Sequence, residues 1–328
     1  MLASVVACHH SDDGVTMRAP PGPGSWTPGA ALAAARFEGA AAVVGDRIYY
    51  VGGITGIIGD QRSARASDRV DILDPASGTW SSGPALPDGG PRHHLAITVA
   101  GGKLYVLGGF TGIIGGAEAA GQFTPNAGTF VLEGSAWRRL ADQPLARGSA
   151  TAQAIGGILF VAGGGIAEPD ARADLYAYDP AQDHWSRRAP MPTAREHVAS
   201  CAIGGKMIVV GGWTDTKTVV SACESYDPSS DTWTRLPDLS TARGGLGAAA
   251  LGNVCHAIGG EHWTGDHPGT FDYNEGFDTT TGRWQNFAPM PTARHGLGLT
   301  AKDGALYAIG GGPEMGNSYT NVVEIFRP

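Results

Sequence analysis

The sequence predicts an all-β fold: a propeller of six blades, each with four antiparallel strands. Three observations lead to it. Glycine is unusually abundant, with 51 of 328 residues, or about 16% against a usual ~7%. Paired glycines recur six times at intervals of 48 to 56 residues. A tryptophan and an arginine recur at regular distances from these pairs, whereas no segment has the length and the 3.6-residue period of a helix.

Composition supports a folded chain with a full core. Hydrophobic residues make up 42% of the sequence and charged residues 16%, whereas a disordered chain would be rich in charge and poor in apolar residues. The net charge of −8 offers no attraction to phosphate backbones or anionic lipid. No apolar run reaches the ~18 residues of a membrane-spanning helix. Nucleic-acid binding and a transmembrane role are therefore excluded.

The glycine doublets mark the first two strands of each blade, a and b. Each doublet ends a short apolar run, and a turn dipeptide stands seven residues before it. The doublets are Gly52-Gly53, Gly108-Gly109, Gly163-Gly164, Gly211-Gly212, Gly259-Gly260 and Gly310-Gly311. The dipeptides are Gly45-Asp46, Gly101-Gly102, Gly156-Gly157, Gly204-Gly205, Gly252-Asn253 and Asp303-Gly304. Such two-residue loops favour the positive φ angles of tight hairpins.

An arginine stands sixteen residues before every doublet, and a tryptophan stands ten or twelve residues before every arginine. The arginines are Arg36, Arg92, Arg147, Arg195, Arg243 and Arg294, and the tryptophans are Trp26, Trp80, Trp137, Trp185, Trp233 and Trp284. We expect the tryptophans to pack between blades. The arginines either bond backbone carbonyls near the start of their strands or face a central anionic ligand, and their invariance favours the first interpretation.

The two ends of the chain predict how the ring closes. Residues 321–326 form the last apolar run, and no tryptophan strand follows it, while Trp26 comes first with no strands a to c before it. We therefore expect the amino-terminal strand to complete the last blade as its fourth strand, d. Closure of this kind removes the exposed edge between the first and last blades.

These motifs together resemble the kelch repeat, which combines a strand hairpin, Gly-Gly, a variable loop, Tyr-Asp-Pro, Trp and a segment ending in Thr-Ala-Arg. The best copies run from Tyr178 to Arg195 and from Tyr226 to Arg243. The resemblance covers about Trp26 to Pro328 and implies a kelch-type β-propeller. The second blade departs from it, because Phe130 to Gly134 replace the Tyr-Asp-Pro turn.

The chain divides into residues 1–24, a short leader with a Pro/Gly linker, and residues 25–328, the propeller. Val5 to Cys8 resemble the lipobox of a bacterial lipoprotein, although no basic segment precedes them. We therefore expect a location outside the cytoplasm, in the periplasm or on a lipid anchor. The other cysteines, Cys201, Cys223 and Cys255, are interpreted as buried small hydrophobes, and cysteine usage does not settle the compartment.

Loop variation predicts the binding face. The a–b turns are uniformly two residues, whereas the b–c loops vary from 54–68 and 110–128 to the short 213–219. Variable loops on a constant scaffold usually carry function. The face that bears the b–c loops, called the b–c face below, is therefore the expected recognition surface.

Two positions in each blade are expected to point to the axis on that face. Family members that bind peptides imply that these positions line the pocket. The residues after the doublets are Ile54, Phe110, Gly165, Trp213, Glu261 and Gly312, and those after the arginines are Phe37, His93, Gly148, Glu196, Gly244 and His295. Blade three contributes only Gly148 and Gly165 to these two sets, so it is expected to present almost no side chain to the pocket. The candidate ligand-binding residues are Ile54, His93, Phe110, Glu196, Trp213, Glu261, Trp263 and His295.

The expected function is non-catalytic binding of a peptide, a protein partner or a glycan on the b–c face by a monomer. We expect no catalytic residue, no metal and no cofactor, because residues 261–267 hold four possible metal ligands in no standard spacing. The resemblance also implies enzyme alternatives. Copper oxidation of the galactose oxidase type needs inward tyrosines, which this chain lacks. A sugar-active enzyme such as a sialic-acid mutarotase is the alternative. Its acid–base groups would be carboxylates and histidines near the pocket, namely Glu196, His197, Glu261 and His295.

Overall fold

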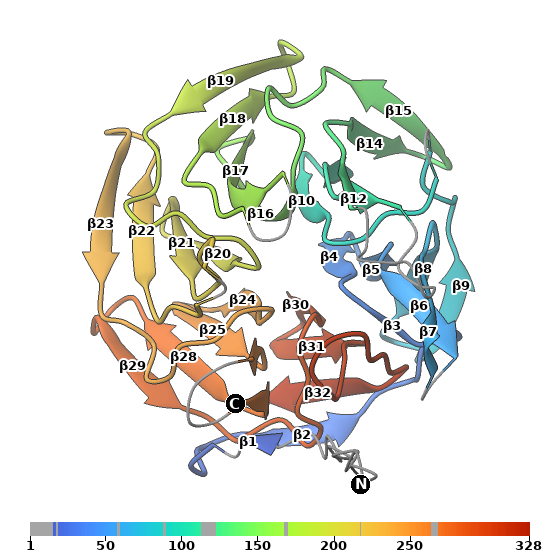
Figure 1. Cartoon of the computed structure of the whole chain (residues 1–328), viewed down its shortest axis with the longest axis vertical. Coiled ribbons are helices and arrows are strands. Elements are labelled where there is room, and N and C mark those ends of the chain that lie inside the picture. The colour runs from blue at the N-terminus through green and yellow to red at the C-terminus, as the bar shows by residue number, and fades with distance from the viewer. Residues whose placement is uncertain are drawn as a thin grey trace, which may run out of the picture.

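A computed structural model describes residues 16–17, 19–57, 60–87, 90–112, 123–166, 170–216, 218–263 and 268–328, with side chains omitted for 16–17 and 60–62. All regular structure within these ranges is strand and turn. Six four-stranded antiparallel sheets surround a central axis (Figure 1). The predicted all-β kelch-type propeller is confirmed. Since the described residues form no helix, they supply no helix that could cross a bilayer.

In each blade, strand a lies at the axis and strand d at the rim (Figure 1). Blade one is β4 (Ala40–Val44), β5 (Arg47–Val51), β8 (Val70–Asp74) and β9 (Thr79–Ser82). Blade two is β10 (Ala96–Ala100), β11 (Lys103–Leu107), β14 (Thr129–Glu133) and β15 (Ala136–Leu140). Blade three is β16 (Gly148–Ile155), β17 (Ile158–Gly165), β18 (Leu175–Asp179) and β19 (His184–Arg188).

The second half of the ring repeats this order. Blade four is β20 (Ala199–Ile203), β21 (Lys206–Val210), β22 (Cys223–Asp227) and β23 (Thr232–Leu236). Blade five is β24 (Gly247–Leu251), β25 (Val254–Ile258), β28 (Asn274–Asp278) and β29 (Arg283–Asn286). Blade six is β30 (Gly298–Lys302), β31 (Ala305–Ile309), β32 (Val323–Arg327) and β2 (Ser25–Pro28). All six predicted dipeptides form the a–b hairpin turns.

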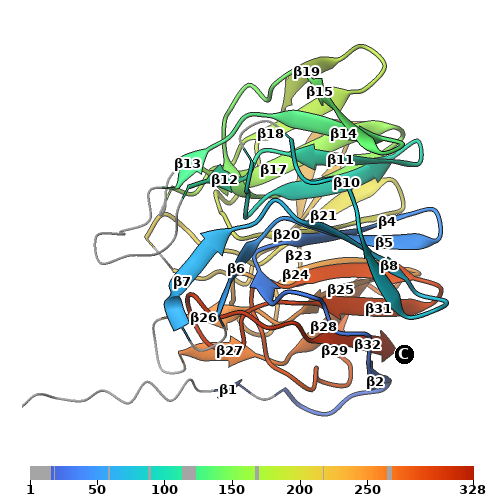
Figure 2. The same cartoon turned by 90° about the vertical axis from the view of Figure 1, so that its right-hand side faces the viewer.

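Short strands lie outside the blades, the first in the connection from β2 to β4 and the others in the b–c loops. They are β3 (Arg36–Phe37), β6 (Ile54–Ile57), β7 (Asp60–Ala66), β12 (Phe110–Thr111), β13 (Thr124–Pro125), β26 (Glu261–His262) and β27 (Gly269–Phe271). The side view places β6, β7, β12, β13, β26 and β27 together on one side of the ring (Figure 2). This side is the b–c face.

The amino-terminal strand β2 completes blade six, as the two chain ends predict. It pairs antiparallel with β32, and Trp26 lies opposite Phe326. The expected linker is also partly ordered, because β1 (Thr16–Met17) pairs in parallel with β27 of blade five. The backbone N–H of Ala19 donates to the Asp272 carboxylate at 2.7 Å. Part of the segment expected as a linker therefore lies along blade five.

The repeated tryptophans connect neighbouring blades, as expected. Each indole N–H donates to a backbone carbonyl in the connection that leaves the preceding blade, at 2.6 to 3.0 Å. The pairs are Trp26 with Ala288, Trp80 with Ala30, Trp137 with Pro84, Trp185 with Ala141, Trp233 with Ala189, and Trp284 with Pro237. One residue type at one position thus fixes all six blade boundaries in the same way.

The six repeated arginines are structural. Every one of them is at most 1% exposed. Four donate to the carbonyl of the first doublet glycine in their own blade, at 2.8 to 3.1 Å: Arg36, Arg147, Arg195 and Arg243. The guanidinium groups therefore stabilise the end of strand b. The interpretation that the six arginines form a ring around a central anionic ligand is wrong.

The second residue of every strand c contacts the guanidinium of the repeated arginine in its blade. In four blades this residue is a carboxylate that forms an ion pair with the guanidinium: Asp71, Glu224, Glu275 and Glu324. In blades two and three it is aromatic, so Arg92 lies over Phe130 and Arg147 over Tyr176, at 4.7 and 5.4 Å from the ring centroids. Either partner offsets the desolvation of a buried cation.

Two cysteines are paired, which corrects their interpretation as separate buried hydrophobes. Cys201 on β20 and Cys255 on β25 form a disulfide between blades four and five, with their Cα atoms 5.8 Å apart. Cys223 is buried and free. The pairing was missed because the two cysteines occupy different positions of the repeat, and the strand pattern does not give the packing angle between blades.

Candidate functional site

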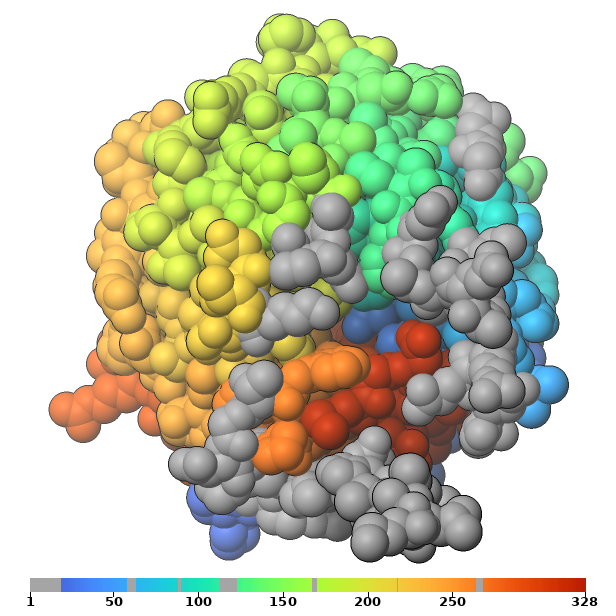
Figure 3. Space-filling view, in the orientation of Figure 1, coloured from blue at the N-terminus to red at the C-terminus, as the bar shows by residue number. Residues whose placement is uncertain are grey.

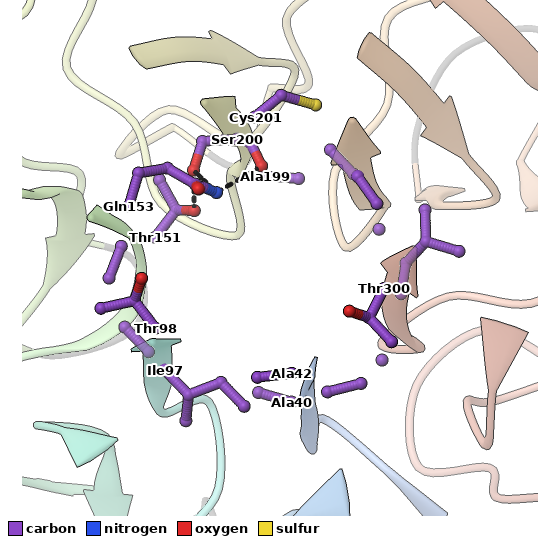
Figure 4. A pocket seen from close by; sticks show the side chains of 18 of the residues that line it. Ala40, Ala42, Ile97, Thr98, Thr151, Gln153, Ala199, Ser200, Cys201 and Thr300 are labelled. Atoms are coloured by element: carbon purple, nitrogen blue, oxygen red, sulfur yellow. Dashed lines mark hydrogen bonds between the residues drawn. The ribbon is translucent and has the colours of Figure 1, made fainter. Parts of the chain in front are cut away.

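Three cavities follow one another along the axis. The first, of about 400 Å³, is lined by the innermost strands of all six blades, and its described lining holds no charged side chain. Figure 4 shows the small side chains that point into it, with Gln153 and Thr151 hydrogen-bonded to Ser200. Alanines, threonines and one glutamine offer little chemistry. This channel fills the centre of the scaffold and is not the candidate site.

The candidate site is the cavity at the opposite end, on the b–c face. It encloses about 460 Å³, and Figure 3 shows a hollow near the centre of this face. Its described lining is Phe37, Glu38, Ile54, His94, Phe123, His197, Glu261, Trp263, His295, Glu314, Met315, Gly316 and Asn317. Three imidazoles and three carboxylates therefore meet five large apolar side chains, the mixture expected of a ligand pocket. We call this cavity the axial pocket.

A narrow waist of about 100 Å³ lies at the base of the axial pocket. Six residues that follow the repeated arginines by two positions all line this waist: Glu38, His94, Ser149, His197, Gly245 and Gly296. Three of them, Glu38, His94 and His197, line the axial pocket as well. These three side chains therefore belong to both cavities.

Four of the eight predicted site residues line the axial pocket. Ile54, Glu261 and His295 form its buried wall, and Trp263 stands at its rim with 48% of its surface exposed. Because Trp263 is the one strongly exposed aromatic residue of the described lining, it is the side chain most available to a ligand.

The other four predicted residues, His93, Phe110, Glu196 and Trp213, are buried outside the lining of the axial pocket. Phe110 and His93 pack against Phe123, with ring centroids 5.4 and 4.7 Å apart. Trp213 packs edge-to-face against Trp263 at 6.2 Å. His93, Phe110 and Trp213 therefore pack directly behind residues of the lining.

The expected axial positions of each blade pair with each other. The residue after the arginine pairs through its backbone with the residue after the doublet. Examples are the isolated antiparallel β-bridges of His93 with Phe110 and of Glu196 with Trp213. The glycines at these positions are filled by neighbours: Phe110 occupies the space beside Gly148, and Trp213 the space beside Gly244. Blade three is therefore not a bare part of the floor, because the aromatic ring of blade two covers it.

Of the residues two positions after the arginines, only His197 was considered from the sequence, as an acid–base group of the sugar-active alternative. The prediction took the residue next to each arginine as axial, and in an extended strand the side chain of the following residue would point the other way. The backbone is left-handed at this point in all six blades, with φ between 48° and 63°. This conformation breaks the alternation. The available signal was the residue series itself, in which Glu38, His94 and His197 stand where blades five and six have glycine.

Backbone hydrogen bonds join these left-handed residues around the axis. Five of these six residues donate their N–H to the carbonyl of the equivalent residue in the preceding blade, at 2.7 to 3.1 Å. The donor and acceptor pairs are Glu38 with Gly296, His94 with Glu38, Ser149 with His94, Gly245 with His197, and Gly296 with Gly245. The waist is thus held by main-chain groups, and its side chains are free to differ between blades.

The charged groups of the axial pocket form one network. His94 Nε2 lies 3.4 Å from Glu38 Oε2, and His295 Nδ1 lies 3.5 Å from Glu261 and 3.7 Å from Glu38. Burial raises the pKa of Glu38, but His94 and His295 outweigh it and hold that pKa well below its usual range. Burial lowers the pKa of His295, but Glu261 and Glu38 outweigh it and raise that pKa overall.

His295 fixes one wall of the axial pocket. Its Nε2 lies 3.0 and 3.1 Å from the carbonyls of Glu314 and Gly316, while Nδ1 faces the two carboxylates. Both ring nitrogens are therefore engaged with the protein. His295 positions the loop at residues 314–316, and Glu38 and Glu261 are left to present carboxylate oxygens to the cavity.

Three sequence features lie partly or wholly outside the described residues. The b–c loops of blades one and two repeat one pentapeptide at 55–59 and 111–115, which suggests either that the two loops pack on each other or that they expose an apolar patch to a partner, but residues 58–59 and 113–115 are not described. The same holds for 264–267 in the loop that begins at Glu261, and for the lipobox-like segment.

A closed ring of four-stranded blades around one axis defines this chain as a β-propeller. The kelch-repeats domain of KLHDC2, KLHL20 and DRC7 matches residues 111–311, and the kelch motif matches residues 35–87. The chain belongs to the kelch-repeat family.

Two comparisons agree with this assignment. The chain is 28% identical over 143 residues to Kelch-like protein terF of Aspergillus terreus, a match that covers 43% of this chain and 30% of that protein. The chain thus matches less than a third of terF. The fold is similar to the solved structure of YjhT, with a TM-score of 0.72 and 17% identity over 89% of this chain and 95% of that one. This likeness concerns the fold alone.

Proposed function

We propose that the protein binds a neutral, hydroxyl-rich ligand, such as a sugar unit of a glycan, in the axial pocket. The observation that carries this proposal is the combination of an exposed indole with buried carboxylates in one cavity. Trp263 stands at the rim, and Glu38 and Glu261 lie at the wall and floor. An indole face packs against the C–H groups of a sugar ring, while carboxylates accept charge-assisted hydrogen bonds from its hydroxyl groups.

The size of the axial pocket supports a small ligand. About 460 Å³ lies within the usual range for small-molecule sites, roughly 300–1,000 Å³. It can hold one or two sugar units or a single peptide side chain, whereas a protein partner would spread over the surrounding loops. A glycan is therefore the best supported of the three ligand classes that the sequence predicts.

The charge of the lining favours a neutral ligand. The described lining contains Glu38, Glu261 and Glu314 and no arginine or lysine. A ligand carboxylate would meet these acidic groups without a guanidinium partner, so binding of an anionic sugar is disfavoured. The repeated arginines do not compensate, because they are buried within the blades.

The sugar-active alternative rests on the same carboxylates. Glu38 and Glu261 flank His295, and a carboxylate beside an anomeric hydroxyl can act as a general base. Catalysis on a neutral sugar would show as faster exchange between its anomers. Binding without faster exchange is what we expect, because both nitrogens of His295 are already engaged.

We also propose a location outside the cytoplasm. The support is the disulfide between Cys201 and Cys255, because disulfides persist in oxidising compartments and are rare in reducing ones. The lipobox-like segment that ends at Cys8 agrees with export. Detection of the oxidised form in a cell fraction outside the cytoplasm would support this proposal.

The test of function measures binding of neutral mono- and disaccharides by titration calorimetry and by tryptophan fluorescence. We expect Trp263→Ala to weaken binding by about tenfold or more, roughly 1.4 kcal/mol, without lowering the melting temperature. Ile57→Ala is the matched control, since Ile57 is 66% exposed in a b–c loop but does not line the axial pocket.

Two outcomes would contradict the proposal. Absence of binding across the neutral sugars, with binding of peptides, would favour a protein partner. Tighter binding of anionic than of neutral sugars would show that the described acidic lining does not select the ligand. Anomer exchange, followed by NMR in the same samples, separates binding from catalysis.

A further inference from the structure

The waist of the axial pocket brings two imidazoles and one carboxylate together. One ligand atom from each of Glu38, His94 and His197 can be chosen so that all three lie within 4.8 Å of one another. Three donors bound to one ion at about 2.0–2.2 Å must lie within roughly 4 Å of each other. The side chains therefore need to close by only about an ångström to hold an ion. From this geometry we propose that these residues bind one divalent transition-metal ion.

The backbone at these positions points to a role beyond architecture. Glu38, His94 and His197 have φ angles of 52°, 52° and 48°, a region in which a non-glycine residue costs on the order of 1–3 kcal/mol. Gly245 and Gly296 take the same place in blades five and six. Glycine therefore adopts the backbone conformation that the ring needs at this position. A histidine or glutamate there contributes a side chain that the backbone does not require.

Neighbouring side chains orient two of the three donors. Nδ1 of His94 is in contact with Nδ1 of buried His93, which directs Nε2 of His94 to Glu38 Oε2, 3.4 Å away. The other carboxylate oxygen of Glu38 faces His295 Nδ1 at 3.7 Å. Groups that hold the far side of a ligating histidine or carboxylate in this way are a regular part of metal sites.

The donor set defines the class of ion. Two imidazoles and one carboxylate suit zinc or ferrous iron, whereas calcium and magnesium prefer sites built of oxygen atoms. Three protein donors also leave a coordination position open. Because all three residues line the axial pocket, a ligand in that pocket would lie next to the open position.

This site differs from the residues that the sequence analysis weighed as metal ligands. Those were the acidic and histidine residues of 261–267 in one loop, whereas Glu38, His94 and His197 come from blades one, two and four. The inference does not depend on the proposed sugar ligand, because its test uses the metal alone.

The experiment uses the full chain without a histidine tag, stripped with a chelator and dialysed against zinc chloride. We expect one zinc ion per chain by elemental analysis, and none retained when magnesium chloride replaces zinc. Cobalt(II) supplies a second readout, because imidazole ligation changes its visible absorption spectrum.

Variants at the left-handed positions separate ligation from architecture. His94→Gly and His197→Gly remove a donor at a φ that glycine accepts readily, and each is expected to weaken zinc binding by at least about 100-fold. Ser149→Gly is the matched control, since it makes the same backbone change in blade three and removes only a hydroxymethyl group. It is expected to bind zinc within about threefold of the natural chain. His94→Asn, which also tolerates this φ, replaces His94→Gly if that variant does not fold.

Three results would overturn the proposal. The first is a folded natural chain that retains no zinc. The second is a His94→Gly or His197→Gly variant that binds zinc as tightly as the natural chain, which would place the ion elsewhere. The third is an equal loss of zinc in Ser149→Gly and His94→Gly, which would assign the effect to the backbone of the ring.

Discussion

The indole of Trp213 occupies the space that a side chain at Gly244 would need. A Cβ built on Gly244 would overlap Nε1 of Trp213. The two residues belong to adjacent blades and to the expected axial positions of each. Trp213 in turn packs edge-to-face on Trp263 at 6.2 Å, so the absence of a side chain at residue 244 helps set the rim of the axial pocket.

Gly244→Ala should therefore destabilise the protein by displacing Trp213. Forcing a methyl group into a packed site costs about 1–3 kcal/mol, and the free energy of unfolding in urea measures it. In a Trp213→Ala background the same change should cost much less, with a coupling of roughly 1 kcal/mol or more. Additive effects of the two substitutions would show that Trp213 does not depend on the space beside Gly244.

The second prediction concerns the amino-terminal strand. Deletion of residues 1–32 removes β2 and Leu32, which is 2% exposed within a hydrophobic cluster. It also removes the hydrogen bond from Trp26 to Ala288. The unfolding temperature of the whole domain should fall, and blade six should lose amide hydrogen-exchange protection. Deletion of residues 1–15 is the control and should leave the unfolding temperature unchanged. Equal melting of both truncations would contradict the role of β2 in blade six.

The third prediction concerns the buried ion pairs. Glu224→Ala leaves Arg195 without its carboxylate partner at 2.7 Å, and breaking a buried pair costs about 3–5 kcal/mol. Glu224→Tyr should be tolerated better, because blade three has Tyr176 at this position beneath Arg147. Unfolding free energies of the two variants make the comparison. If tyrosine destabilised as much as alanine, the aromatic and acidic partners would not be equivalent.

The fourth prediction concerns thiol chemistry in a Cys8→Ser background. Burial raises the pKa of the Cys223 thiol to about 12, although nearby Arg195 lowers it, so the native protein should not react with an alkylating reagent at pH 8. In denaturant without a reductant one thiol should react, and three should react after reduction. Replacing Cys201 and Cys255 by serine should lower stability by about 2–4 kcal/mol. Mass spectrometry counts the labels, and two or more labels before reduction would argue against the disulfide.

The fifth prediction concerns pH. Burial lowers the pKa of His256, despite its hydrogen bond with Asn274, and its ring packs on Phe287 and Phe326. The unfolded state then binds a proton below about pH 6.5 that the folded state does not. Stability contributed by this residue should therefore be present above that pH and be lost as the pH falls through it. His256→Gln should show a shallower loss of unfolding free energy between pH 7 and pH 5, whereas an unchanged slope would assign the pH effect to other histidines.

The repeat explains how much of the fold could be predicted. Residues such as Arg195 and Trp185 perform the same task in six blades, so their spacing alone indicates strands, turns and closure. The partners of the arginines were harder to predict, because the position is acidic in four blades, as at Glu224, and aromatic in two, as at Tyr176. Both kinds stabilise a buried guanidinium, but they share no residue type that repetition could reveal.

The candidate site could be predicted only in part, for a different physical reason. Ile54, Glu261 and His295 were found because the kelch resemblance implies that the residues after the doublets and after the arginines line the pocket. Glu38 and His94 were missed because they lie in a left-handed backbone conformation, and a sequence does not display its φ angles. Trp213 was assigned to the ligand although it supports a neighbour, because the filling of a glycine position depends on the packing between blades.

The hydrogen bond from Glu38 N–H to the Gly296 carbonyl, at 2.7 Å, joins the first blade to the neighbouring sixth blade where the ring closes. A polypeptide still lacking its last blade has no acceptor for this bond, so Glu38 would have no fixed position beside His94. The axial pocket is therefore assembled by completion of the ring and not by any one blade. During synthesis the protein would have no formed axial pocket until nearly the whole chain had emerged and folded, and a damaged sixth blade would displace residues encoded near the other end of the gene.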